Sequence, residues 1–153
     1  APGLARAVYF TGGHNGSLVI EGDLSATSSA GATHGMLVDA GDQFQASVRN
    51  VQVEGGGNAI QGVALNVGSG GYLSQEGLIE VKGTSADSNV RGVNVLAQEG
   101  FSASIDNVAV EGLRSALGVY WSSTDGASLI HTGAISATAT RVESLVVDRI
   151  YQA

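Results

Sequence analysis

The sequence predicts an all-β protein that folds as a parallel β-helix, or β-solenoid, of about five coils of roughly 26–30 residues each. Three observations lead to this prediction. A short apolar phrase recurs at a nearly fixed period, apolar residues alternate inside each phrase, and Gly, Ser, Asn and Asp cluster between the phrases. A period of this size is typical of folds in which each repeat stacks on its neighbours.

The apolar phrase begins with a small residue and occurs five times at nearly equal intervals, with a looser sixth copy one interval earlier, near the start of the chain. Alternate apolar residues such as Val63 and Leu65 indicate a strand with one buried face. The copies are Gly35–Val38, Gly62–Leu65, Gly92–Val95, Gly118–Trp121 and Ser144–Val147, with Ala7–Phe10 as the sixth.

A second phrase, rich in valine, lies ahead of the first in each period and predicts further short strands. Its two clearest copies, Ser47–Gly55 and Ser104–Gly112, are two periods apart. Leu78–Gly83 lies between them, and looser copies cover Val19–Leu24 and Ile130–Ile135. An aromatic or small residue opens the unit in four periods: Phe44, Tyr72, Phe101 and Ala127.

Stacking of the coils places equivalent residues in ladders along the axis, at a spacing of about 4.8 Å. One expected inward ladder is Val8, Met36, Val63, Val93, Val119 and Leu145, and the next is Phe10, Val38, Leu65, Val95, Trp121 and Val147. The residues between them then form an outward column: Tyr9, Leu37, Ala64, Asn94, Tyr120 and Val146. Such an apolar stripe marks a binding face or a face covered by a loop or domain. Tyr9, Leu37, Tyr120 and Val146 are therefore the candidate binding residues.

Composition excludes several classes of function. The net charge of −7, with seven Lys and Arg, argues against nucleic-acid binding and against binding to anionic lipid. The absence of Cys excludes disulfides and cysteine-based metal sites. No apolar run approaches the roughly 20 residues of a membrane-spanning helix, so no membrane span is expected in this segment.

The residues that commonly carry chemistry do not form a recognisable site. His14, His34 and His131 are scattered, and the glycine runs lack the Asp of calcium-binding repeats, so no metal and no cofactor is expected. The carboxylate pairs Asp39/Asp42 and Glu21/Asp23 are interpreted as solvated charges. We therefore expect no catalytic residues and no enzyme activity. Asn50 and Asn107 occupy the same place in the repeat and are expected to hydrogen-bond to backbone amides at a corner.

The repeat resembles the passenger domains of bacterial autotransporters, particularly the pertactin-like group, over nearly the whole chain, from about Ala7 to Ile150. The resemblance rests on Ala46–Val48, Gln61–Leu65, Ser102–Ile105 and Val108–Leu113. It implies a right-handed parallel β-helix that is secreted or displayed on the bacterial outer membrane as a rod. It also implies a role in adhesion, aggregation or toxicity, and it carries no defined site residues.

Together these observations predict that residues 1–153 are one β-helix segment of a longer repetitive protein. We expect a non-catalytic module for adhesion, self-association or host interaction. Its possible partners are a host receptor, a glycan or a second copy bound through the coil ends or the outer column. A glycan-binding or glycan-cleaving β-helix of the phage-tail or polysaccharide-lyase type is one alternative, and a structural spacer is another. A β-sandwich is the competing fold, although its hairpin turns would need more pairs like Asn15-Gly16.

Overall fold

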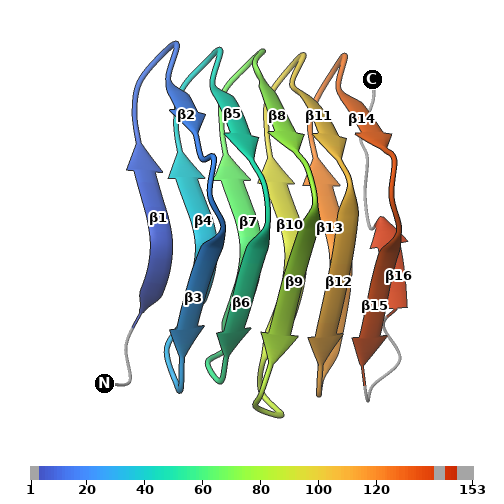
Figure 1. Cartoon of the computed structure of the whole chain (residues 1–153). Coiled ribbons are helices and arrows are strands. Elements are labelled where there is room, and N and C mark those ends of the chain that lie inside the picture. The colour runs from blue at the N-terminus through green and yellow to red at the C-terminus, as the bar shows by residue number, and fades with distance from the viewer. Residues whose placement is uncertain (1–3, 140–143, 148–153) are drawn as a thin grey trace.

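The computed structural model describes residues 4–139 together with the backbone of residues 144–147. In this part of the chain every regular element is a strand, and the strands wind into a parallel β-solenoid of about five coils. Figure 1 shows the coils side by side in chain order. None of the described residues forms a helix long and apolar enough to cross a membrane. The predicted fold class is therefore confirmed.

Each coil contributes one strand to each of three parallel sheets. Sheet A contains β1 (Ala5–Thr11), β4 (Thr33–Asp39), β7 (Ala59–Asn66), β10 (Asn89–Leu96), β13 (Ser115–Ser122) and β16 (Ser144–Val147). Sheet B contains β2 (Ser17–Val19), β5 (Gln45–Val48), β8 (Tyr72–Gln75), β11 (Ser102–Ile105) and β14 (Ser128–His131). Sheet C contains β3 (Leu24–Ser28), β6 (Val51–Gly55), β9 (Leu78–Gly83), β12 (Asn107–Gly112) and β15 (Ile135–Ala139).

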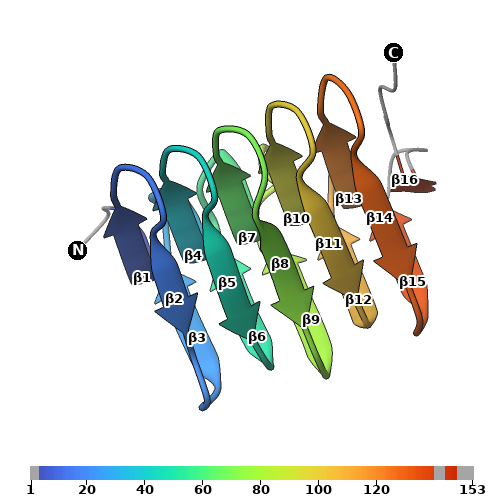
Figure 2. The ribbon, with the colours of Figure 1, turned by 90° about the horizontal axis from the view of Figure 1, so that it is seen from above.

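The turns between sheet A and sheet B stack as a row of similar arcs, as Figure 2 shows from above. Glycine allows the tight backbone geometry there: Gly70, Gly71, Gly100 and Gly126 have positive φ angles. Backbone bonds also join turns of neighbouring coils, for example from the Gly70 amide to the Glu99 carbonyl at 2.7 Å. The glycine runs therefore act as coil corners, as the sequence predicts.

The core is a column of apolar side chains enclosed by the three sheets. The two predicted ladders of sheet A are confirmed from β1 to β13, with Met36, Val63, Val93 and Val119 all fully buried. β-Branched residues dominate because they suit the pleated, closely stacked surface of a strand. Sheet C adds an inward ladder of its own, in which Val53 pairs with Val81.

In the core of sheet B, large and small residues alternate from one coil to the next. The inward position just before each sheet B strand holds Gly16, Phe44, Gly71, Phe101 and Ala127 in successive coils. Two residues further on, the same coils carry Leu18, Ala46, Leu73, Ala103 and Leu129. A coil with Phe at the first position thus has Ala at the second, and a coil with a small residue has Leu. Each large ring thus lies between coils that carry only Gly or Ala at that position, as close packing requires.

The structure corrects two details of the predicted alignment. Val147 lies opposite Val119, so neither Leu145 nor Val147 continues its expected ladder. The register of the last coil is thus shifted by two positions from the one that the recurring phrase predicts. Tyr72 does not share a position with Phe44, because it pairs with Gln45 and is 44% exposed. Gly71 takes the inward place, because a side chain there would meet the Phe44 backbone.

Candidate functional site

The outer face of sheet A carries two parallel rows of side chains, one on each side of a row of glycines. We call the first row the arginine column; its members are Arg6, His34, Gln61, Arg91 and Leu117. We call the second row the tyrosine column; its members are Tyr9, Leu37, Ala64, Asn94 and Tyr120. The tyrosine column matches the predicted outward column from β1 to β13.

The glycines between the columns interrupt the alternation of the strands. Val63 is fully buried, yet a Cβ on the preceding Gly62 would also meet core side chains, namely Ile79 and Val81 of sheet C. It would lie 2.6 Å from the carbonyl oxygen of Gly92 in the next coil, so only glycine fits there. Two successive residues therefore face the core, and the outward residues on either side are three apart in sequence instead of two.

This interruption brings the two columns into contact. The Arg6 guanidinium carbon lies 4.4 Å from the centre of the Tyr9 ring. The Arg91 guanidinium carbon lies 4.9 Å from the ring of Tyr120 in the next coil. Arg91 also donates a hydrogen bond of 3.3 Å to Asn94 Oδ1. Each arginine is held over an aromatic face, an arrangement worth about 0.5–1 kcal/mol at an exposed site.

The charge of sheet A differs in sign from that of the whole chain. Among the strand residues of sheet A, two arginines stand against one carboxylate, Asp39, whereas the chain as a whole carries −7. Sheet C has the opposite balance, with three glutamates, Glu54, Glu80 and Glu111, against one lysine. Among the described residues Arg49 forms an ion pair with Glu76, and His14 Nδ1 lies 3.4 Å from an Asp42 carboxylate oxygen. Arg6 and Arg91 therefore have no carboxylate partner in that part of the chain.

His34 lies in the arginine column between Arg6 and Gln61, and its exposed fraction is only 9%. Burial lowers the pKa of His34 below the ordinary value of 6.5, the positive charge of Arg6 lowers it further, and a hydrogen bond with the Gln61 side chain opposes the shift. Burial and the Arg6 charge thus both favour the neutral imidazole of His34. Its Nδ1 atom is buried and has no hydrogen-bond partner among the described residues.

An open groove of about 430 Å³ runs across three coils beside the arginine column. Its lining combines apolar side chains with uncharged polar ones, and the guanidinium of Arg91 is its one charged group. Amide and hydroxyl groups of this kind both donate and accept hydrogen bonds. The groove is lined by Asn58, Ala59, Gln61, Asn89, Val90, Arg91, Ser115 and Leu117.

The structure places the predicted binding residues unequally. Tyr9 is the most accessible of them, with 54% of its surface exposed, and it is adjacent to Leu37 in the next coil. Leu37 and Tyr120 are half-buried, and they lie three coils apart. Ala64, a member of the same column, is buried. The side chain of Val146 lies outside the described residues, and the backbone register places residue 146 beside position 118 and not beside Tyr120.

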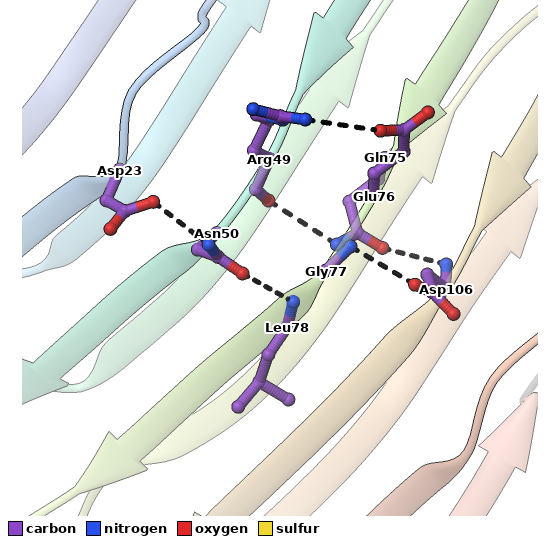
Figure 3. A network of polar contacts seen from close by, with 8 residues as sticks. All are labelled: Asp23, Arg49, Asn50, Gln75, Glu76, Gly77, Leu78 and Asp106. Carbon is purple, nitrogen blue, oxygen red and sulfur yellow. Dashed lines mark hydrogen bonds and ion pairs between the residues drawn. The ribbon is translucent and has the colours of Figure 1, made fainter.

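A second polar constellation, at the corner between sheets B and C, stabilises the stacking of coils. Figure 3 shows its hydrogen bonds running from coil to coil. Asn50 donates to Asp23 at 3.0 Å and accepts from the Leu78 amide at 2.9 Å. Buried Gln75 accepts from the Asp106 amide at 2.9 Å and donates to the carbonyl oxygen of Arg49.

The same corner confirms the predicted role of the repeated asparagines. Asn107 Oδ1 accepts a 2.9 Å hydrogen bond from the Ala134 amide of the next coil. Asn50, two coils earlier, accepts the equivalent bond from the Leu78 amide. Leu78 occupies the intervening place opposite Asn107, so no continuous asparagine ladder forms. These polar groups are used to satisfy turn amides.

The other candidate groups stay apart. The described residues contain no group of three or more His, Asp or Glu side chains placed to hold a metal ion. Asp42 accepts the Ser69 amide at 2.8 Å and pairs with His14, which gives it a role in the turn. His131 is exposed on β14, as expected for a solvent-facing strand histidine.

Sequence reasoning identified the tyrosine column but missed the two arginines beside it. Arg6 stands three residues before Tyr9, and Arg91 stands three residues before Asn94. The available signal was an arginine directly before the small residue that opens the recurring phrase, as Arg6 and Arg91 are. Two such arginines in five coils form no obvious repeat. The contact between Arg91 and Tyr120 joins different coils, so it depends on the register.

The fold and this face define a parallel β-solenoid with an outward arginine–tyrosine surface. Comparisons with protein-family models, with curated proteins and with solved structures found no match.

Proposed function

We propose that this chain is a non-catalytic contact module of a bacterial secreted or surface-displayed rod, of the autotransporter-passenger kind. It acts in adhesion or self-association through the outer face of sheet A. The observation that carries the proposal is the pairing of Arg6 with Tyr9 and of Arg91 with Tyr120 on one face of a stacked sheet. Tyr and Arg are the residues most enriched where proteins contact partners.

The architecture supports display of this face at fixed spacing. In each coil three strands pair with equivalent strands of the neighbouring coils, so the outward side chains cannot shift independently. The chemistry of the face favours binding over glycan hydrolysis. Hydrolysis commonly needs two carboxyl groups flanking the scissile bond, whereas the strand residues of sheet A include one carboxylate, Asp39.

The test compares tyrosine-to-serine substitutions on two faces of the rod. Beads coated with the chain are assayed for attachment to epithelial cell monolayers and for clumping with one another. The variant Tyr9→Ser/Tyr120→Ser should lose most of the attachment or clumping of the unchanged chain. Tyr72→Ser alters an exposed tyrosine on sheet B and should retain it.

Circular dichroism and thermal unfolding of both variants serve as the control for loss of the fold. The proposal fails if beads with the unchanged chain neither attach nor clump. It also fails if Tyr72→Ser reduces attachment as much as the sheet A variant does.

A further inference from the structure

We propose that the outer face of sheet A binds a linear acidic polysaccharide that carries carboxylate groups, with Arg6 and Arg91 as the anion-binding residues. This inference rests on the proposed function and names the chemical class of its ligand. It starts from the guanidinium groups of Arg6 and Arg91, which have no carboxylate partner among the described residues.

The geometry of the arginines suits an extended ligand that lies along the rod. Arg6 and Arg91 occupy the same column three coils apart, which is about 14 Å at the usual spacing of strands. Each guanidinium lies over a tyrosine ring, which limits its motion and leaves its N–H groups to bind an anion. A guanidinium binds a carboxylate through two parallel hydrogen bonds, and this match is specific to Arg.

The groups around the arginines match sugar hydroxyls. Gln61, Asn89 and Ser115 line the groove beside Arg91, and their side chains both donate and accept hydrogen bonds. Tyr9 offers an exposed ring edge next to Arg6, and binding sites for small polar ligands combine such rings with a few placed polar groups.

An acidic peptide is less suited to this face. Extended peptides commonly bind by adding a strand to a free sheet edge. Strands β4, β7, β10 and β13 are each paired on both sides, so this face offers side chains and no unpaired backbone groups along its middle. A ligand on the middle of this face must therefore be recognised by side chains, at positions that repeat with each coil.

The experiment measures binding of the full chain to polygalacturonate by biolayer interferometry, with neutral dextran and polyglutamate as comparison probes. We expect binding to polygalacturonate that weakens with added NaCl, because exposed charges are screened by salt. Arg6→Gln/Arg91→Gln should weaken it at least about tenfold, or about 1.4 kcal/mol. The matched control, Arg49→Gln/Lys82→Gln, removes two positive charges elsewhere and should stay within about twofold, because Arg49 lies at the corner between sheets B and C and Lys82 on sheet C.

The inference is overturned if polygalacturonate does not bind, if both double variants weaken binding equally, or if polyglutamate binds as well as polygalacturonate. These outcomes are distinct from failure of the proposed function. Beads that still attach or clump through Tyr9 and Tyr120, without binding polygalacturonate, would keep the contact face and remove its assigned ligand.

Discussion

Phe44 provides the sharpest test of the alternating core. Its side chain is fully buried, its ring lies 5.4 Å from that of Phe10, and the equivalent positions above and below it are Gly16 and Gly71. In Phe44→Ala, these neighbours have no side chains that could move into the space left by the ring. A buried Phe→Ala change costs about 3–5 kcal/mol, and the poor capacity of the site to collapse argues for a cost of about 4 kcal/mol or more. For a chain of this length the midpoint of thermal unfolding should fall by roughly 8–16 °C.

The assay is urea unfolding followed by far-UV circular dichroism and by fluorescence of buried Trp121, which reports on a coil three positions away from Phe44. The control is Phe10→Ala, because Phe10 is half-buried and lies in the first described coil. That change should cost about half as much, since less area leaves water. The reasoning is refuted if Phe44→Ala destabilises the chain no more than Phe10→Ala does.

Three further predictions use the same unfolding assay. Gly92→Ala should cost about 1–3 kcal/mol of stability, because the new Cβ would lie 2.6 Å from a carbonyl oxygen of the neighbouring coil. The control Gly22→Ala, with open space around it, should change stability by less than about 0.5 kcal/mol. Equal effects of the two changes would contradict the crowding argument. Asn107→Ala should cost about 1 kcal/mol through the loss of its bond to a backbone amide of the next coil, and an unchanged urea midpoint would argue against that role. His34→Gln should reduce the loss of stability on acidification. The pKa of His34 is lowered below 6.5 in the folded chain, so the unfolded chain binds more protons than the folded chain as the pH falls below 6.5. The contribution of His34 to stability is therefore retained above that pH and lost below it. Unfolding free energies at pH 7.5 and pH 5.5 check this, and an equal loss in both proteins would contradict it.

The fold follows from the sequence because stacking repeats the same physical demand in each coil. An inward position such as Val63 must be apolar and fit a pleated surface, so it recurs visibly one coil later as Val93. The corner glycines are equally visible, since few other residues accept their backbone angles. The core ladders and the corner role of Asn50 could therefore be predicted before any coordinates.

The errors came from places where packing, and not residue type, decides the alignment. Tyr72 and Phe44 look equivalent as aromatic residues, yet the backbone of Phe44 leaves space only for glycine, and Tyr72 moves to the solvent face. The recurring phrase aligned Ser144 with the glycine of the preceding copy, whereas the structure pairs Ser144 with Ala116 and so places Leu145 beside Leu117.

The candidate site could be predicted only in part for a related reason. The tyrosine column lies within the recurring phrase and was found with it. Arg6 and Arg91 lie outside the phrase and far apart in the sequence, and they acquire a common role only when three intervening steps of register are known. The buried state of His34 depends on its neighbours in other coils and has no local signal.

The alternation of large and small residues in sheet B has a consequence for how such a chain can change its length. Removal or duplication of a single coil would set Phe against Phe, or Leu against Leu, in adjacent layers, with overpacking in one layer and a void in the other. Removal or duplication of two coils keeps the sequence of layers in phase. A change of length by a pair of coils is therefore the one that this core accommodates, and the same spacing separates the two most similar segments of the chain.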